Sequence, residues 1–262
     1  MSESNPVLEY ELSARYGSET VLHNIAGRIR AGEIVALVGF SGSGKSTLAL
    51  ALLRLLRYRG GEVTGSIRLE GTELCGLGEH DMRRVRGRRI GYVPQNPASA
   101  LNGKLRVETL LDETWRAHAD EPARPGAYAA LLESVQLESD RAFLQRRAGG
   151  LSTGQGQRLL IALAIMHNPA LLIADEPTSS LDAINQAKLL RLFLQLNQSR
   201  GTAMLFISHD LSSVAEIGNR VDILHDGRIV ESGAPKEIFR NPRHPFTRDL
   251  VAAIPRNPLA DR

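Results

Sequence analysis

The sequence has 262 residues, of which 42% are hydrophobic, and 32 basic residues against 29 acidic ones leave a formal net charge of +3. The apolar fraction excludes wholesale disorder. Because basic and acidic residues are nearly balanced, the charge disfavours a protein that coats nucleic acid. The longest apolar run, Leu159–Met166, is far below the roughly 18 residues of a membrane span. We expect no secretory signal in the first 30 residues, and the single cysteine, Cys75, excludes an intrachain disulfide.

The first third of the chain predicts a small antiparallel sheet. Leu8–Tyr16 alternates apolar and polar residues, Val21–Ile29 repeats the alternation after a turn, and Gly61–Leu74 is typical of further strand with glycine turns. Elsewhere, continuous apolar runs indicate parallel strands covered on both faces, at Ile34–Val38, Leu171–Ala174 and Ala203–Ile207. Helical patterns lie between them, at Ser46–Leu56, Gln155–His167 and Ala183–Ser199. This alternation predicts an α/β fold with a wound parallel sheet.

The middle of the chain has no strand pattern. Helices are predicted over Val107–Trp115 and Tyr128–Leu137, with a proline-containing break at Glu121–Gly126, so residues 96–150 form a candidate inserted helical subdomain. The arginine-rich run Arg83–Arg89 before it is interpreted as a solvated linker that precedes a strand, with contact to phosphates as the alternative.

Turn and helix signals end the chain. Asp226-Gly227 lies between two short strand patterns, Val221–Leu224 and Arg228–Glu231, and predicts a hairpin. Short helices are expected from Pro235 and over Phe246–Ile254.

A phosphate-binding motif lies between the first parallel strand and its helix. The segment Gly39–Ser46 has the form G-x-x-x-x-G-K-[ST], whose glycines let backbone N–H groups surround phosphate oxygens. Lys45 would bridge the β and γ phosphates, and the Ser46 hydroxyl would bind Mg²⁺. We expect ATP to contact Gly39, Ser41, Gly42, Ser43, Gly44, Lys45, Ser46 and Thr47.

Two adjacent carboxylates end a buried strand about 130 residues later. Asp175 at the end of this strand would reach the Mg²⁺ ion, and Glu176 could act as general base for the attacking water. Together with the phosphate motif, this pair predicts hydrolysis of a nucleoside triphosphate.

Further motifs resemble those of the ATP-binding-cassette (ABC) ATPases. Leu151–Gln155 resembles the family's signature, Tyr92–Gln95 its Q-loop, Ser179–Asp182 its D-loop and Ile207–Asp210 its switch-histidine loop. The resemblance implies that Gln95 senses metal and water, that His209 holds the γ-phosphate, and that Tyr16 stacks on adenine. It also implies that Ser46, Gln95 and Asp175 bind the metal.

The resemblance also implies an architecture. It covers Leu8 to about Gly233 and implies a P-loop ATPase core with an N-terminal antiparallel β subdomain and an inserted α-helical subdomain. We therefore expect an ATPase domain at 1–233, with the helical subdomain at about 96–150, and a short tail at 234–262.

In this family two chains pair head to tail, and the signature of one closes over the ATP of the other. The residues that would act on the partner's ATP are Ser152, Thr153, Gly154, Gln155 and Asp182. Two positions depart from the family pattern: Thr153 replaces a glycine, and Gly156 stands where a larger residue is common. A β-branched residue restricts the backbone where it must approach phosphate closely, so we hypothesise a heterodimer with two unequal sites.

The C-terminal motifs are similar to those of the dipeptide, oligopeptide and nickel importers. They are Gly227–Gly233, Glu237–Phe239 and Asn241–Thr247, together with Gln95–Pro97 and Ser99–Asn102. The resemblance implies a peripheral ATPase at the cytoplasmic face of the cell membrane, with a second ATPase, two permeases and an extracytoplasmic solute-binding protein, and no nucleic acid. With no cysteine after Cys75 the chain looks more like the short nickel- or metallophore-type members. A permease helix is expected to contact Ala100, Leu101 and Leu105.

Three other functions are weighed against the importer. An accessory ATPase in a metabolic complex of the carbon–phosphorus lyase type shares the tail motif. A cassette that acts on DNA or the ribosome is supported by the Arg83–Arg89 run alone. An assembly factor with a structural nucleotide is disfavoured by Glu176, which would be dispensable there.

Overall fold

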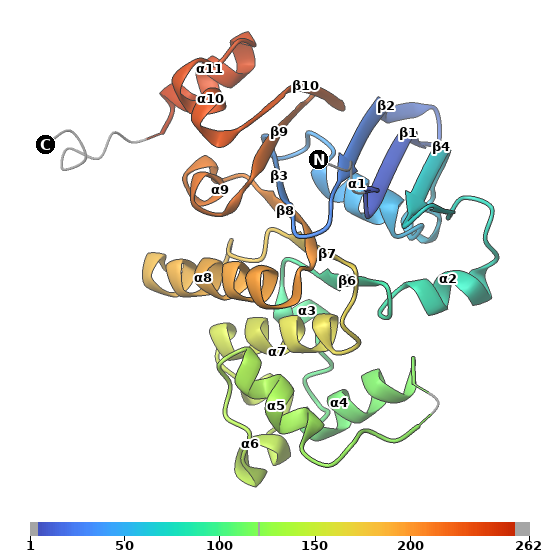
Figure 1. The fold of residues 1–262 in the computed structure, drawn as a ribbon, viewed down its shortest axis with the longest axis vertical. Helices are drawn as coiled ribbons and strands as arrows, with labels where there is room; N and C mark the ends of the chain where they lie inside the picture. The colour runs from blue at the N-terminus through green and yellow to red at the C-terminus, as the bar shows by residue number, and fades with distance from the viewer. Residues whose placement is uncertain (1–4, 120, 255–262) are drawn as a thin grey trace, which may run out of the picture.

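The computed structural model describes residues 5–119 and 121–254, and it contains two β-sheets with helices packed around them (Figure 1). The smaller sheet is antiparallel and has the strand order β2-β1-β4-β5. Its strands are β1 (Leu8–Tyr16), β2 (Glu19–Ile29), β4 (Gly61–Leu69) and β5 (Thr72–Glu73). Buried and exposed residues alternate along most of β1, which confirms the half-buried sheet that the sequence predicted.

The larger sheet positions the site. Its order is β10-β9-β3-β8-β7-β6, and all neighbours pair in parallel except β10 with β9. The strands are β3 (Ile34–Val38), β6 (Ile90–Val93), β7 (Leu171–Asp175), β8 (Ala203–Ser208), β9 (Arg220–His225) and β10 (Arg228–Gly233). Every residue of β3, β7 and β8 is buried, as expected for strands covered on both faces. Parallel strands end at one edge of the sheet, so the loops after β3, β6, β7 and β8 meet there.

The helices of the core follow the predicted alternation with one difference in length. They are α1 (Lys45–Leu52), α7 (Thr153–Ile165), α8 (Ala183–Arg200) and α9 (Leu211–Ile217). Helix α1 ends four residues before the predicted Leu56, because Arg54 adopts a left-handed backbone (φ 53°) and a 3-10 helix follows at Leu56–Arg59. The Arg54 guanidinium donates 2.6 Å hydrogen bonds to the carbonyls of Leu74 and Leu77, which fixes this turn.

The described residues between 97 and 145 contribute four helices, which lie below the parallel sheet in the view of Figure 1. They are α3 (Pro97–Ala100), α4 (Val107–Arg116), α5 (Ala127–Ser134) and α6 (Arg141–Gln145). Leu111, Leu132 and Phe143 are buried in one apolar cluster with residues of α7 and α8.

Helices α3 and α7 lie unusually close together. A Cβ added to the buried Gly156 of α7 would lie 3.2 Å from Cβ of Pro97 in α3, closer than ordinary carbon–carbon contact. Glycine at this position therefore permits the close approach of the two helices, which is a physical reason for the small residue that the sequence showed there.

The interpretation of Arg83–Arg89 as a solvated linker before a strand is correct only in part, because residues 86–89 do precede β6 but the run begins inside a helix. Helix α2 (Glu79–Val85) includes Arg83 and Arg84, and Arg86 and Arg89 are tied to the core. Arg86 donates 3.0 Å to the Leu53 carbonyl and pairs with Glu79, and Arg89 pairs with Glu70 at 2.8 Å. A run of like charges hides this pattern, because the sequence does not show which arginines meet carboxylates from distant segments.

The hairpin and the last helices lie where the sequence predicted them. Asp226 and Gly227 both have positive φ (45° and 69°), as a tight two-residue turn between β9 and β10 requires. Helices α10 (Pro235–Arg240) and α11 (Pro245–Ala252) follow, and the part of the predicted tail beyond residue 254 lies outside the described residues. Glu231 accepts hydrogen bonds from the N–H groups of Arg243 (2.9 Å) and His244 (3.0 Å), which joins the tail to β10.

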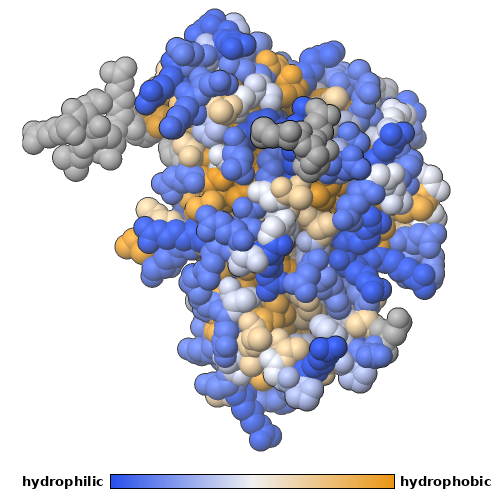
Figure 2. Space-filling view, viewed as in Figure 1, coloured by the Kyte–Doolittle hydropathy of each residue, from blue (hydrophilic) through white to orange (hydrophobic). Residues whose placement is uncertain are grey.

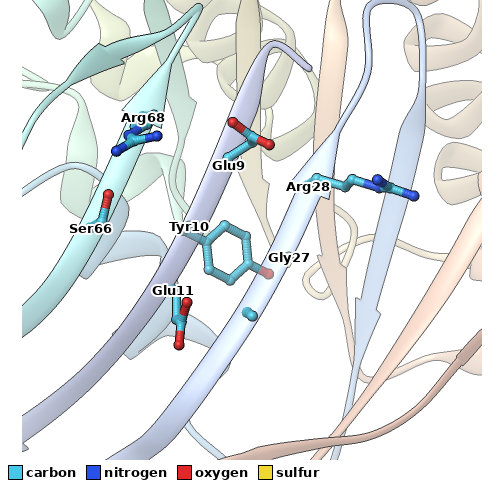
Figure 3. Close-up of a pocket in the computed structure, with 8 residues that line it drawn as sticks. Glu9, Tyr10, Glu11, Gly27, Arg28, Ser66 and Arg68 are labelled. Carbon is cyan, nitrogen blue, oxygen red and sulfur yellow. The ribbon is translucent and has the colours of Figure 1, made fainter. Parts of the chain in front are cut away.

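A shallow hollow of about 530 Å³ lies on the antiparallel sheet, among Glu9, Glu11, Arg28 and Arg68 (Figure 3). The buried ring of Tyr10 forms part of its wall and lies against Gly27, where an added Cβ would be 2.4 Å from the hydroxyl. Burial, together with the charge of Asp222, raises the pKa of Tyr10 well above its ordinary value.

The surface of the view in Figure 1 is largely hydrophilic, with apolar residues showing between polar ones around its middle (Figure 2). None of the helices in the described part of the chain combines the length and the apolarity that a membrane crossing needs.

Candidate active site

The loop between β3 and α1 has the conformation that a phosphate cradle requires. Gly42 and Gly44 adopt left-handed backbones (φ 85° and 103°), which other residues adopt only with strain. The Lys45 ammonium lies inside the loop and donates 2.9 Å hydrogen bonds to the carbonyls of Gly39 and Phe40. Burial lowers the pKa of Lys45, although the neighbouring carboxylates of Glu176 and Asp175 oppose this shift.

The loop also contains a polar atom that a ligand would satisfy. The Ser43 hydroxyl oxygen is buried and has no hydrogen-bond partner among the described residues. A buried hydroxyl without a partner is costly, and this one lies in a loop rich in glycine beside a buried ammonium. The residues present therefore fit an anionic ligand with several oxygen acceptors, such as a triphosphate.

Asp175 connects the phosphate loop to two neighbouring strands. Its Oδ1 accepts a 3.1 Å hydrogen bond from the Ser46 hydroxyl, and its Oδ2 accepts one of 3.3 Å from the Tyr92 hydroxyl. Burial raises the pKa of Asp175, and the two hydrogen bonds counteract part of this effect. A hydroxyl and a carboxylate at this distance are oxygen ligands of the type that Mg²⁺ prefers.

The carboxylate of Glu176 contacts three other predicted site residues. Its Oε2 accepts a 3.1 Å hydrogen bond from Nε2 of Gln95 and lies 3.1 Å from Nδ1 of His209, and its Oε1 lies 3.7 Å from Nζ of Lys45. Glu176 has a left-handed backbone (φ 46°), uncommon for a residue with a side chain and frequent at functional sites. One carboxylate is thus held by residues from three loops at the same edge of the sheet.

Sequence reasoning missed two residues of this arrangement. Tyr92, the first residue of the predicted Q-loop, binds Asp175, and the Ser179 hydroxyl accepts a 3.3 Å hydrogen bond from Gln95. Their adjacency to predicted motifs was the available signal. Contact itself depends on the pairing of β6 with β7, which brings Tyr92 beside Ile173.

The signature residues do not take part in this site within one chain. Ser152 begins α7 with a reciprocal capping pair, in which its hydroxyl accepts from the N–H of Gln155 at 3.2 Å and the Gln155 side chain accepts from the N–H of Ser152 at 3.1 Å. Thr153, the first residue of the helix, is exposed. Among the described residues, no hydrogen bond joins these residues, or Gly154, to the phosphate loop.

Asp182 and Tyr16 lie at element ends. Asp182 begins α8 and accepts from the N–H groups of Ile184 and Asn185, and the bond from Asn185 contributes most to lowering the pKa of this carboxyl. Tyr16 ends β1 half-buried, and an added Cβ on Gly61 would lie 3.0 Å from its ring. No contact between Tyr16 and the phosphate loop is recorded in the described part of the chain, so its stacking on adenine stays a prediction.

A second charged region lies away from the strand ends. Four arginines from α2, the loop after it and the end of α4 surround a cavity of about 420 Å³, the basic cavity. It is lined by His80, Arg83, Arg84, Arg88, Arg116, Ala117, His118 and Ala119. The His118 ring lies against the backbone of Gly87, where an added Cβ would be 2.3 Å from Nε2. Of the described residues, none forms a hydrogen bond or ion pair with the side chains of Arg84, Arg88 or Arg116.

Comparison with known proteins agrees with this arrangement. Residues 22–179 match the family described as "ABC transporter". The "Putative peptide import ATP-binding protein" of Brucella melitensis is 45% identical over 240 residues, covering 87% of this chain and 70% of the relative. The oligopeptide transport ATP-binding protein OppD of Lactococcus lactis is 36% identical over 239 residues, covering 90% and 71%.

Solved structures show the same fold. A dimeric post-hydrolysis state of the ATP-binding cassette MJ0796, bound to ADP and Pi, has a TM-score of 0.74 at 25% identity and covers 87% of this chain and 98% of that chain. The structure of cbiO1 from Clostridium perfringens has a TM-score of 0.78 at 24% identity and covers 91% and 92%.

Proposed function

From the premise that this chain belongs to the ABC transporter family and is an ATPase, we propose that it hydrolyses ATP to drive the import of peptides or a related solute through partner permeases. The observation that carries the proposal is the convergence of Lys45, Gln95 and His209 on Glu176, beside the Ser46–Asp175 pair. The chain's relatives with peptide-import names support the peptide class. A nickel or metal-chelate solute is the finer alternative, based on the tail motifs.

We assign the following roles to these residues, and the geometry of the site supports them. Lys45 would hold the phosphates, and Ser46, Asp175 and Gln95 would hold Mg²⁺, which would neutralise phosphate charge when it is bound. Glu176, fixed by Gln95 and His209, accepts a proton from the attacking water, and His209 positions the γ-phosphate. In this proposal residues 1–233 form the ATPase domain, with the helical subdomain at 96–150 and a tail at 234–262.

We propose that the chain works in a head-to-tail pair with a second, related ATPase. The solved dimer of MJ0796 with ADP and Pi supports the pairing, and the exposed position of Thr153 at the start of α7 supports an effect on the partner's nucleotide. The side chain of Thr153 would restrict close approach to that phosphate. Full hydrolysis at both sites of a homodimer of the purified chain would contradict unequal sites. Replacement of Thr153 by glycine tests the same idea in the complex.

The permease surface is proposed near α3. A cavity of about 330 Å³ lies between α3 and the start of α7, lined in part by Asn96, Pro97 and Ser152. Of the three predicted contact residues, Ala100 is exposed, Leu105 is half-buried, and Leu101 is buried at 9% exposure. Substitution of Leu101 would therefore test folding, and Ala100→Glu is the informative change for transport. Transport by Ala100→Glu at the wild-type rate would contradict this surface.

The experiment that tests the function is affinity purification of the tagged chain from membranes of its own host. Recovery of two permeases and a second ATPase supports an importer at the cytoplasmic face of the membrane. Recovery of a metabolic complex of the carbon–phosphorus lyase type, without permeases, would overturn it.

A further inference from the structure

The C-terminal tail contacts the phosphate loop through one pair of aromatic rings. Phe40, the second residue of the loop, and Phe246, in the first turn of α11, lie edge to face with ring centroids 5.1 Å apart. Phe246 is buried, at 8% exposure, whereas Phe40 is 56% exposed. A large apolar ring in water on the nucleotide-binding loop is costly, and the tail covers one side of it.

The ring of Phe246 is itself held in place. His225, the last residue of β9, stacks on it at 3.8 Å with an interplanar angle of 16°. The N–H of Phe246 donates a 3.3 Å hydrogen bond to Nδ1 of His244, and Glu231 binds the backbone just before it. The ring therefore presents a fixed surface to Phe40.

Phe40 in turn contacts Lys45, the lysine expected to bind phosphate. Its carbonyl accepts hydrogen bonds from Nζ of Lys45 (2.9 Å) and from the N–H of Ser43 (3.2 Å). Fixing the ring of Phe40 restricts the peptide that carries this carbonyl. The loop then keeps one conformation before a ligand arrives, and binding costs less conformational entropy.

We propose that Phe246 of the tail is a positioning residue for the phosphate loop, acting through Phe40 to hold the loop and Lys45 ready for the nucleotide. The role lies in binding, since in the described part of the chain Phe246 has ring contacts with Phe40 and His225 but no hydrogen bond or ring contact with Glu176, Gln95 or His209. Loss of the ring therefore raises KM for ATP and leaves kcat nearly unchanged. This role goes beyond transport and depends only on the ATPase activity.

The test compares two side-chain truncations on α11, with ATP binding measured on the purified chain and hydrolysis measured on the chain together with its partner ATPase. Phe246→Ala removes the ring that touches Phe40. Leu250→Ala removes a side chain of similar burial (7% exposed), one turn later in the same apolar cluster and without recorded contact to Phe40. We expect Phe246→Ala to raise KM and the Kd for ATP about threefold to tenfold, the range for a lost aromatic pair, with kcat within about twofold. Leu250→Ala lowers the melting temperature comparably but changes KM by less than about twofold.

Two further variants separate positioning from general loss of stability. Phe246→Tyr keeps the ring and is expected to restore KM to within about twofold of the wild type. In a double-mutant cycle, Phe40→Ala with Phe246→Ala raises KM no more than the larger single effect, because both remove the same contact. The proposal would be overturned if Phe246→Ala and Leu250→Ala changed KM equally. It would also be overturned if the KM increase in the double variant equalled the product of the increases in Phe40→Ala and Phe246→Ala.

Discussion

Charged side chains gather in two regions of this molecule, and the two regions are built in opposite ways. At the strand ends, Lys45 has two carbonyl partners and Glu176 has Gln95 and His209, so charges of both signs are paired across loops. Around the basic cavity, Arg84 and Arg88 have no such partner in the described ranges. The paired charges hold their geometry without a ligand. In the basic cavity, by contrast, like charges lie close together, and those of Arg84 and Arg88 do not stabilise the fold through ion pairs with described residues.

This contrast shows that the catalytic region is distinguished by charged side chains that have partners, and not by a high density of charge. The Arg83–Arg89 run is the densest cluster of basic residues in the sequence, and its arginines divide into two that fasten α2 and β6 to the core and others that face the cavity. The nucleotide site uses a single lysine, which is buried among partners. The predictions below alter one region at a time.

The largest expected effect comes from removal of the paired cation. Lys45→Ala is expected to raise the Kd for MgATP by about 100-fold or more, because a buried ammonium aimed at phosphate contributes a charge-assisted hydrogen bond that alanine cannot replace. Calorimetric titration of the purified chain measures it, with circular dichroism as the control for folding. Binding within about tenfold of the wild type would contradict the assignment of Lys45.

A loss of comparable size, confined to hydrolysis, is expected when the charge of Glu176 is removed with little change of shape. Glu176→Gln is expected to lower kcat by about 100-fold or more, the usual effect of losing a general base, while the Kd for MgATP stays within about threefold. Single-turnover hydrolysis together with equilibrium binding measures both. If binding fell as much as hydrolysis, Glu176 would have a structural role.

The basic cavity gives a pH-dependent prediction. The ring centroid of His167 lies 5.5 Å from that of His118 of this cavity. Burial lowers the pKa of both histidines, and the charge of Arg88 lowers both further. Because the folded-state values lie below the unfolded ones, the folded state resists protonation, and stability is lost as the pH falls below about 6.5. Arg88→Ala is expected to raise both pKa values toward the ordinary one and to flatten this loss. Thermal melting between pH 7.5 and 5.5 tests it, with Arg191→Ala on α8 as the control.

The smallest effect is expected in a carboxylate far from both regions. Burial acts to raise the pKa of Glu73, but hydrogen bonds from the Ser66 hydroxyl and from the N–H groups of Cys75 and Ile67 outweigh it and lower the pKa to about 2. This stabilisation is present above about pH 4.5 and is lost as the pH falls toward 2. Glu73→Gln is expected to cost about 1–2 kcal/mol at pH 7, discounted because the side chain is 39% exposed. Urea unfolding at pH 7 and pH 3 measures the difference, and an equal cost at both pH values would contradict it.

The sequence predicted most of the site because its motifs have strict local geometry. Gly39–Ser46 needs a strand before it and a helix after it, and the pattern of apolar residues showed both. The other loops follow parallel strands, so their meeting at one edge follows from the direction of the chain. Only the pairing of strands decides which side chains touch, and the contact of Tyr92 with Asp175 could not be derived without it.

Other misses arose where one residue adopts an unusual conformation or a distant partner intervenes. The left-handed backbone of Arg54 ended α1 early because its guanidinium found carbonyls about 20 residues later in the chain. Leu101 looked available to a partner protein, yet it is buried in the core that includes α4 and α7. Neither contact leaves a periodic signal in the sequence.

The missing side chain at Gly156 has a mechanical consequence. Pro97 lies two residues after Gln95, and Gly156 lies four residues after Ser152. The close contact of Pro97 with Gly156 therefore links the Q-loop to the start of α7. A displacement of the Gln95 loop toward α7 would therefore displace the start of α7 as well, because little space separates Pro97 from Gly156. In the proposed pair, Gln95 would face the chain's own nucleotide and Ser152 its partner's, so the contact of Pro97 with Gly156 would connect the two nucleotide sites.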